Sequence, residues 1–145
     1  MDFFSAMDIS SSALAAERTR MNLISSNLAN ANSTRTAEGG VYRRKDAVFT
    51  AQPLNEKFQS RLDRFTQPAL KQVGVSEIVE DSLPPRLQYE PTHPDANADG
   101  YVSLPNINVM EEMVDMMSAT RAYEANITAV QAAKSMALKT LELGR

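Results

Sequence analysis

The strongest constraint on the fold of this chain is an apolar repeat that occurs twice, once near each end. In the C-terminal repeat, residues spaced four and then three apart are apolar except at Thr120 and Lys134: Val109, Met113, Met116, Tyr123, Ile127, Val130, Ala137 and Leu141. This alternation is the spacing of a coiled-coil seam, along which one apolar stripe of a helix faces a partner. It predicts one helix over residues 106–143, roughly 50 Å long at 1.5 Å per residue.

The N-terminal repeat has the same four-three spacing and predicts a second helix over residues 3–31. Its apolar positions are Phe3, Met7, Leu14, Met21, Ile24, Leu28 and Ala31. Ser10 and Glu17 interrupt the repeat; we interpret them as tolerated edge positions, although polar residues in a seam can also set register with a neighbouring chain. Because Asn favours caps and turns, the helix is expected to end within residues 27–32, where Asn recurs.

A second row of mostly small residues runs along another side of the C-terminal helix: Ala119, Ala122, Ala125, Ala129, Ala133 and Met136. A helix that is apolar on more than one side is normally enclosed on more than one side. We therefore expect the seam to pair with the N-terminal helix and the second row to contact neighbouring subunits. In such an assembly the apolar seam residues named above for both repeats are also predicted to be subunit-interface residues, apart from Ala31. Asn108 and Glu111 match a capping box at the helix start, where Glu112 and Asp115 add favourable negative charge.

The middle of the chain is of a different kind, because all seven prolines fall between the two repeats. A proline in a helix interior costs about 3 kcal/mol or more, so a long helix excludes it. The proline distribution predicts three parts: an N-terminal helix over 1–32, a middle region over 33–105 and a C-terminal helix over 106–145. An insertion over 52–70 is a further interpretation of the middle region.

Short strands paired as hairpins are expected in the middle region. Residues 41–49 and 73–79 are β-prone, and Leu87 and Tyr89 alternate in the same way. Residues 54–65 place apolar side chains on one helical face and predict a short helix. The fold class is therefore mainly α, with two long terminal helices paired as an antiparallel coiled-coil domain and a small Pro-rich β/irregular middle region. Because an isolated hairpin is marginal, this region should lean on the helices or on another subunit.

Composition argues against most chemical functions. The net charge of -3 is spread evenly along the chain, so no basic face indicates nucleic acid. There is no Cys, and His93 is the only His, so neither a zinc site nor a Cys-His or Ser-His nucleophilic pair can be assembled. We predict no catalytic residue, no cofactor, no metal and no small-molecule substrate.

The best metal candidate is Asp95-Ala96-Asn97-Ala98-Asp99-Gly100, which fits the first half of an EF-hand calcium loop. The twelfth place should hold a bidentate Glu and instead holds Asn106, and Pro105 sits where the exiting helix should begin. We favour a Gly-terminated turn here, with a calcium-responsive module as the lesser alternative.

Two clusters allow more than one interpretation. The basic run Arg43-Arg44-Lys45 is interpreted as a solvated strand face, with a docking contact as the alternative. The cluster Met110, Met113, Met116 and Met117 can fill a core between helices or form a pliable binding surface, since thioethers adapt to irregular partners.

Residues 22–33 resemble the Asn-rich signature near the N-terminus of bacterial flagellar rod, hook and hook-associated proteins. The motif residues there are Asn27, Asn30 and Asn32. Residues 108–114, 118–126 and 134–141 are similar to the C-terminal helix of the proximal-rod members of this family, through Arg121, Tyr123 and Asn126 among others. Residues 87–91 and 99–102 also fit those members, whereas residues 52–70 do not match the pattern.

The resemblance implies a structural axial subunit of the flagellar basal body. In such proteins the terminal helices pair into an inner coiled-coil domain, and copies stack helically into the proximal rod, which connects the MS ring and export gate to the distal rod and transmits torque. The implied partners are other copies of itself, other proximal and distal rod subunits, the MS-ring/rod junction protein and the flagellar type III export apparatus. The implied location is the periplasmic rod, reached without a cleaved signal peptide.

An alternative from another class remains open at this point. A cytoplasmic coiled-coil adaptor or regulator that binds a single partner would also need apolar helices at both ends.

Overall fold

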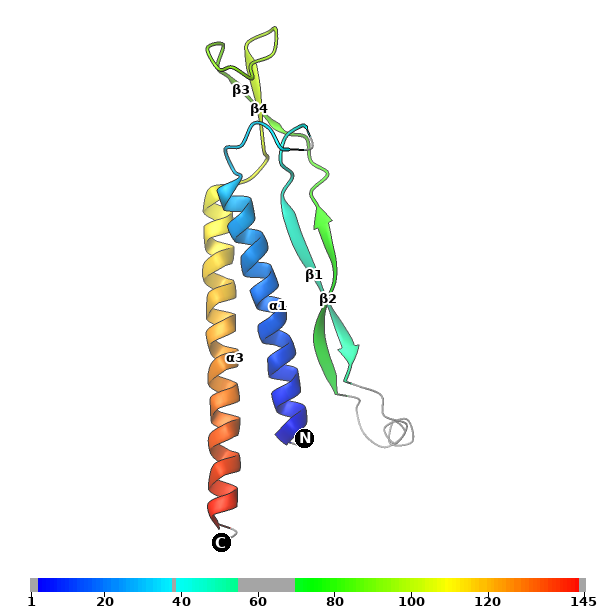
Figure 1. The fold of residues 1–145 in the computed structure, drawn as a ribbon, viewed down its shortest axis with the longest axis vertical. Helices are drawn as coiled ribbons and strands as arrows, with labels where there is room; N and C mark the ends of the chain where they lie inside the picture. Colours follow the sequence, from blue (N-terminus) through cyan, green and yellow to red (C-terminus); the bar gives the residue numbers. More distant parts are fainter. Residues whose placement is uncertain (1–2, 38, 55–69, 144–145) are drawn as a thin grey trace.

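The computed structural model describes residues 3–37, 39–54 and 70–143. Its elements in chain order are α1 (Phe3–Ala29), β1 (Lys45–Pro53), β2 (Lys71–Glu80), β3 (Arg86–Tyr89), β4 (Tyr101–Leu104) and α3 (Val109–Leu143). Figure 1 shows α3, α1 and the β1–β2 hairpin lying side by side, with β3 and β4 beyond one end of the helices. Both chain termini lie at the opposite end.

The two predicted terminal helices are confirmed. α1 and α3 pack against each other and run in opposite directions (Figure 1). Asn108 is the N-cap of α3, because its Oδ1 accepts a hydrogen bond from the Met110 N–H at 3.1 Å. Among the described helices and strands, α3 packs only against α1, whereas α1 also packs against β1 and β2. α1 is therefore covered on two sides and α3 on one.

The row of α3 that faces α1 combines parts of the two rows that the sequence predicts. Ala119 and Ala133 are buried, and the row that includes them keeps a four-three spacing: Glu112, Met116, Ala119, Tyr123, Asn126, Val130, Ala133 and Ala137. Val109, Met113 and Leu141, assigned to the seam, are exposed instead. The predicted division into a seam for α1 and a second row for neighbours therefore holds only in part, because Ala119 and Ala133 of the second row face α1. Ala119 and Ala133, the two buried apolar residues of this row, allow α1 to approach closely.

The β1–β2 hairpin leans on α1. Its strands are antiparallel, with Lys45 opposite Glu80 and Pro53 opposite Lys71. The Ser12 hydroxyl of α1 accepts a hydrogen bond from the Val73 N–H at 3.2 Å. The strand predicted over 73–79 is confirmed, while the strand predicted from residue 41 begins only at Lys45. The predicted helix over 54–65 and most of the 52–70 insertion lie outside the described residues.

The second hairpin, β3–β4, contains the turn that the sequence predicts. Gly100 has a φ of +82°, which favours glycine. The Asn97 Oδ1 accepts hydrogen bonds from the N–H groups of Asp99 and Tyr101 at 3.0 and 2.9 Å. Asp95 accepts a hydrogen bond from the Thr34 hydroxyl, and in the described part of the chain no three His, Cys, Asp or Glu side chains gather in a way that could hold a metal ion.

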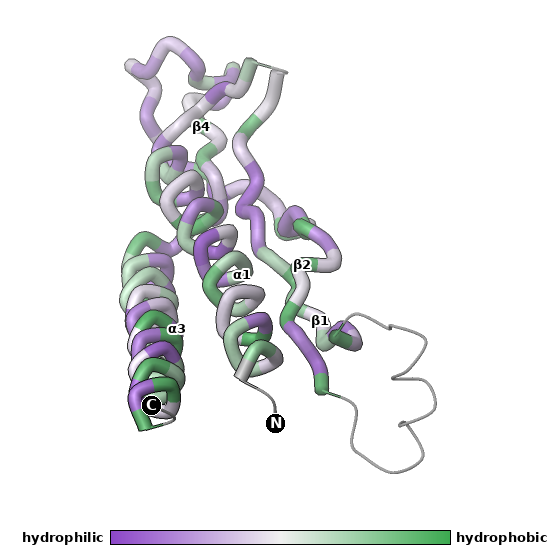
Figure 2. Tube along the Cα trace, turned by 60° about the horizontal axis from the view of Figure 1, so that its bottom comes forward, coloured by the Kyte–Doolittle hydropathy of each residue, from purple (hydrophilic) through white to green (hydrophobic). Residues whose placement is uncertain are grey.

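The hydrophobic core is small. Its buried apolar residues are Ala16, Ile24, Ala31, Val102, Leu104, Ile107, Ala119 and Ala133. Large apolar side chains are instead exposed along α3, and Figure 2 shows hydrophobic segments recurring down to its C-terminal end. None of the described helices is apolar over a stretch long enough to cross a membrane. The amount of exposed apolar surface on α3 is unusual for a chain that acts alone.

Candidate functional site

A buried polar cluster lies where the end of α1, the start of β1 and the start of α3 meet. We call it the polar junction: Asn27, Tyr42, Arg44, the Lys45 backbone and Glu112. Asn27 is 0% exposed and Glu112 is 1% exposed, and both are among the most buried side chains described. Polar groups buried this deeply require partners, because an unpaired one costs about 1–3 kcal/mol.

Asn27 uses its full hydrogen-bonding capacity. Its Oδ1 accepts from the Lys45 N–H at 3.0 Å and from the Tyr42 hydroxyl at 3.1 Å. Its Nδ2 donates to the Lys45 carbonyl at 2.9 Å and to Glu112 Oε2 at 3.0 Å. An Asn amide has two donor hydrogens and two acceptor lone pairs, so none is left over. This one side chain therefore ties α1 to both β1 and α3.

Glu112 carries the charge of the junction. Its Oε1 accepts a hydrogen bond from Arg44 Nε, while its Oε2 accepts from Asn27. Burial by itself would lower the pKa of Arg44, but the hydrogen bond and charge of Glu112, with help from Asp46, raise it. Arg44 therefore stays positive and neutralises a carboxylate that would be very costly to bury alone.

Comparison with known proteins matches both ends of the chain to families of flagellar rod proteins. Residues 7–35 match the family described as "Flagella basal body rod protein", and residues 98–143 match "Flagellar basal body rod FlgEFG protein C-terminal". The flagellar basal-body rod protein FlgC of Bacillus subtilis is 45% identical, and that of Salmonella typhimurium 43%, each over 100% of both chains. The Aquifex aeolicus FlgC is 41% identical over 98% of this chain and 97% of its own.

The chain belongs to the FlgC family. FlgC-family proteins are structural rod proteins, so this chain is a structural protein and not an enzyme. Asn27 lies in the segment that matches the N-terminal rod family and Glu112 in the segment that matches the C-terminal one. Their hydrogen bond thus joins the two parts of the FlgC chain by which the family is recognised.

The other motif residues have local roles or none that the structure shows. Asn30 Nδ2 donates to the Ser26 carbonyl at 2.9 Å, and the Asn30 backbone N–H donates to the same carbonyl at 3.1 Å. Asn126 Nδ2 donates to the Ala122 carbonyl at 2.9 Å and is half-buried. Asn32 and Arg121 are exposed. Among the Asn residues of the motif, Asn27 is therefore the one that links separate elements.

The residues predicted to form subunit interfaces fall into two groups in the FlgC chain. The first is already covered within the chain, buried at Ile24 and half-buried at Met7, Leu14, Met21, Leu28, Met116, Tyr123, Ile127, Val130 and Ala137. The second is exposed and consists of Val109, Met113 and Leu141. The side chain of Phe3 lies outside the described residues. Contact of either group with another subunit stays a prediction.

One interpretation of a charged residue was wrong, and another was incomplete. Arg44 does not belong to a solvated strand face, since it forms an ion pair with the buried Glu112. Glu112 is more than a favourable charge at a helix start, because it accepts hydrogen bonds from two other elements. Arg44 and Glu112 are 68 residues apart in sequence, so no spacing rule could pair them. The recurrence of Asn around Asn27 was the one feature of the sequence that pointed to the polar junction.

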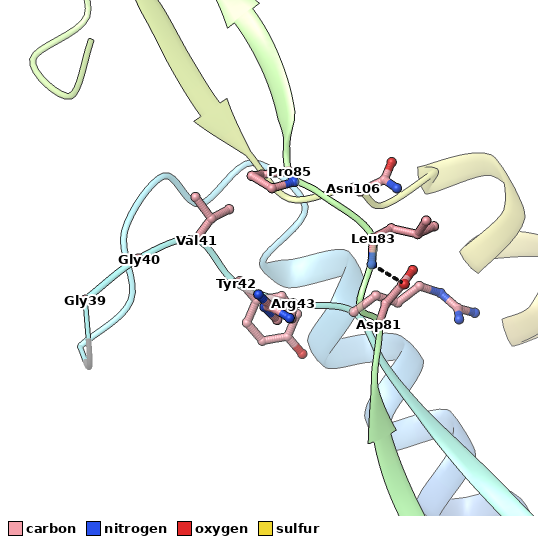
Figure 3. A pocket seen from close by; sticks show the side chains of 10 residues that line it. Gly39, Gly40, Val41, Tyr42, Arg43, Asp81, Leu83, Pro85 and Asn106 are labelled. Atoms are coloured by element: carbon pink, nitrogen blue, oxygen red, sulfur yellow. Dashed lines mark hydrogen bonds between the residues drawn. The ribbon is translucent and has the colours of Figure 1, made fainter. Parts of the chain in front are cut away.

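A pocket of about 270 Å³ opens beside the junction. Figure 3 shows it between the loop at Gly39 and Gly40 and the segment that carries Asp81 and Leu83. Asp81 Oδ1 accepts a hydrogen bond from the Leu83 N–H at 2.8 Å, which fixes this segment. The described residues that line the pocket include no Ser, Cys or His. It therefore offers none of the usual nucleophile-base pairs.

Proposed function

We propose that this chain is a subunit of the proximal rod, in which copies polymerise helically into a drive shaft that connects the MS ring and export gate to the distal rod. Membership of the FlgC family makes it a structural component of the flagellar basal-body rod. The observation that carries the finer proposal is the uncovered apolar surface of α3. Among the described elements α3 packs only against α1, yet it exposes Val109, Met110, Met113, Val114, Met117, Met136, Leu138, Leu141 and Leu143.

In this proposal residues 1–32 and 106–145 form an antiparallel coiled-coil inner domain, and residues 33–105 form the middle region. The four-three spacing of the row that faces α1 supports the coiled coil. The polar junction fixes how the two helices are aligned, as a polar residue in an apolar seam does. A shaft that transmits torque needs subunits whose helices do not slide past one another, which is the property that a saturated buried network supplies.

The proposed partners are other copies, other proximal and distal rod subunits, the MS-ring/rod junction protein and the flagellar type III export apparatus. The proposed location is the periplasmic rod, reached without a cleaved signal peptide. The similarity of the whole chain to proteins named for the flagellar basal-body rod supports this placement. It does not favour a cytoplasmic adaptor that binds a single partner.

The test is incorporation into the rod. Met113→Glu places a charge on the exposed apolar surface of α3, away from α1, and should abolish both incorporation and motility while the variant is still exported. Ser25→Glu, on the exposed face of α1, is the matched control and should leave both intact. Purified basal bodies that contain the Met113→Glu chain at the wild-type level would contradict the proposal.

A further inference from the structure

We propose that Glu17 of α1 pairs with a positively charged side chain of a neighbouring rod subunit when the subunits assemble. This inference rests on the proposed function, because it names one contact by which the helix pair meets the rest of the rod. Three features support it: the place of Glu17 between the helices, a buried oxygen that lacks a hydrogen bond, and the contrast with Glu112.

Glu17 lies on the side of α1 that faces α3. It precedes Met21 by one helical turn, and the Met21 sulfur accepts a hydrogen bond of 3.8 Å from the Thr120 hydroxyl of α3. Because the two helices are antiparallel, one turn back along α1 is one turn forward along α3, which places Glu17 at the level of residues 123–124. A carboxylate therefore stands in the row by which α1 contacts α3.

One oxygen of this carboxylate is buried without a partner. Among the residues that the structure describes, Glu17 Oε2 is the one buried side-chain nitrogen or oxygen that forms no hydrogen bond. The ion pairs between described residues do not involve Glu17 either. Leaving a buried polar group unpaired is costly, and more so for a charged group. The single chain therefore carries an unmet hydrogen bond between its two long helices.

The Glu17 carboxylate is within reach of another molecule. The residue as a whole is half-buried, so part of its side chain is exposed at the border of the helix pair, and the adjacent Arg18 is exposed. The last torsion of a Glu side chain is soft, and rotation about it exchanges the two oxygens. A donor that approaches from outside can therefore bond to either oxygen without separating α1 from α3.

Glu112 shows how this chain accommodates a carboxylate between the helices. It is 1% exposed and lies in the row of α3 that faces α1. One of its oxygens pairs with the Arg44 guanidinium, and the other accepts a hydrogen bond from Asn27. The chain thus supplies a cation and a donor to Glu112 and neither to Glu17 Oε2. That difference assigns the partner of Glu17 to another molecule.

Assembly makes a cation the fitting partner. In the proposed rod, a neighbouring subunit that covers the border of the helix pair removes the Glu17 carboxylate from water. A carboxylate buried in this way is costly unless a positive charge pairs with it. A guanidinium or ammonium group of the incoming subunit supplies that charge and donates the hydrogen bond that Oε2 lacks. A misplaced neighbour would leave the charge buried and unpaired, so the contact also selects the correct position.

The competing explanation is that Glu17 is merely tolerated at the edge of the row. Ser10 is the other polar interruption of the same row, and it leaves no buried oxygen without a partner. If Glu17 were only tolerated, an apolar side chain in its place would stabilise the free chain and leave assembly unchanged. If Glu17 receives a partner's cation, the same substitution stabilises the free chain but impairs assembly.

Glu17→Leu in the full-length chain separates these explanations. It replaces the unpaired oxygen with an apolar side chain, so the urea midpoint of the free chain should rise. It also leaves the partner's cation without its carboxylate, so incorporation into purified basal bodies should fall at least about ten-fold. Glu17→Gln keeps an oxygen that accepts a hydrogen bond but loses the charge, and incorporation should fall less, about two- to five-fold.

Ser10→Leu is the matched control, because it places the same side chain at the other half-buried interruption of the row. It should leave incorporation at the wild-type level. Wild-type incorporation of Glu17→Leu would overturn the inference, as would an equal loss for Ser10→Leu. A fall in the urea midpoint of Glu17→Leu would also overturn it, because Glu17 would then serve the folding of its own chain. The rod assignment stands in each case, whereas absence of the wild-type chain from purified basal bodies would overturn the proposed function instead.

A second experiment identifies the source of the cation. Glu17→Arg brings two positive charges together and should abolish motility. Motile revertants should carry a second change that replaces an exposed Arg or Lys of a rod subunit with an acidic or neutral residue. A change in this chain indicates a second copy as the partner, and a change in a different rod protein indicates that protein. Revertants altered only in the row of α3 that faces α1 would overturn the proposed contact.

Discussion

Asn27 Nδ2 donates a hydrogen bond of 3.0 Å to Glu112 Oε2, across 85 residues of sequence. Both side chains are almost inaccessible to solvent, and both bond to groups on the segment that leads into β1. The bond therefore fixes α1, α3 and the β1–β2 hairpin at a single point. Because four of the eight buried apolar residues described are alanines, this polar point of attachment carries an unusual share of the specificity of the fold.

Removing the Asn27 amide should be costly. Asn27→Ala leaves the Lys45 N–H and carbonyl and one oxygen of Glu112 without their partner, and we expect a loss of about 2–4 kcal/mol in the free energy of unfolding. The measurement is the urea midpoint of the full-length chain. Asn32→Ala, at an exposed position of the same motif, should change the free energy of unfolding by less than about 0.5 kcal/mol. Equal effects of the two substitutions would contradict the assignment.

Arg44 and Glu112 should be energetically coupled. Arg44→Met removes the cation and leaves a buried carboxylate uncompensated, which should cost about 3 kcal/mol. Glu112→Leu alone leaves the Arg44 cation without its partner. Because the Arg44 side chain is partly exposed to solvent, this loss should cost less. The double variant should be more stable than the sum of the single losses predicts, by at least about 1 kcal/mol. Strict additivity in a double-mutant cycle would show that the ion pair does not hold the junction together.

The contribution of Arg44 to the free energy of unfolding should be the same at pH 7 and at pH 10. The pKa of Arg44 is raised in the folded chain, so its stabilisation is fully present below the unfolded pKa and is lost only at still higher pH. We expect the stability difference between the wild type and Arg44→Met to be the same at pH 7 and pH 10. Arg44→Lys gives the contrast, because an ordinary Lys begins to lose its charge near pH 10. A stability difference between the wild type and Arg44→Met that is smaller at pH 10 than at pH 7 would contradict the pairing of Arg44 with Glu112.

Gly100 should be required for the β3–β4 turn. Its φ is +82°, and a Cβ at this position would lie 2.9 Å from the Tyr89 ring. Gly100→Ala should therefore cost both the strain of a left-handed conformation and the displacement of the ring, about 2 kcal/mol in total. Gly40 has a φ of +94° with nothing within 4 Å of its Cβ position. Gly40→Ala isolates the backbone part, and an equal cost at both glycines would exclude a role for the Tyr89 contact.

Local patterns in the sequence could predict the elements, but not which surfaces meet. The boundaries of α1 and α3 follow from apolar spacing, the cap at Asn108 and the absence of proline, all of which act within a few residues. The turn at Gly100 is equally local. The choice of the row with Ala119 and Ala133 as the face of α3 against α1 depends on how closely the two helices approach, which is a property of the pair. The junction needs Arg44 and Glu112 to meet across 68 residues, and no periodicity records that pairing.

The central claim is that α3 is covered on one side by its own chain and on its other sides only in the rod. Amide hydrogen exchange of the full-length chain, in dilute solution and in purified rods, tests this most directly. We predict that assembly increases protection along α3, most of all over residues 138–143, and changes it least around Asn27. Full and equal protection of both helices in the dilute chain, unchanged in the rod, would contradict the account.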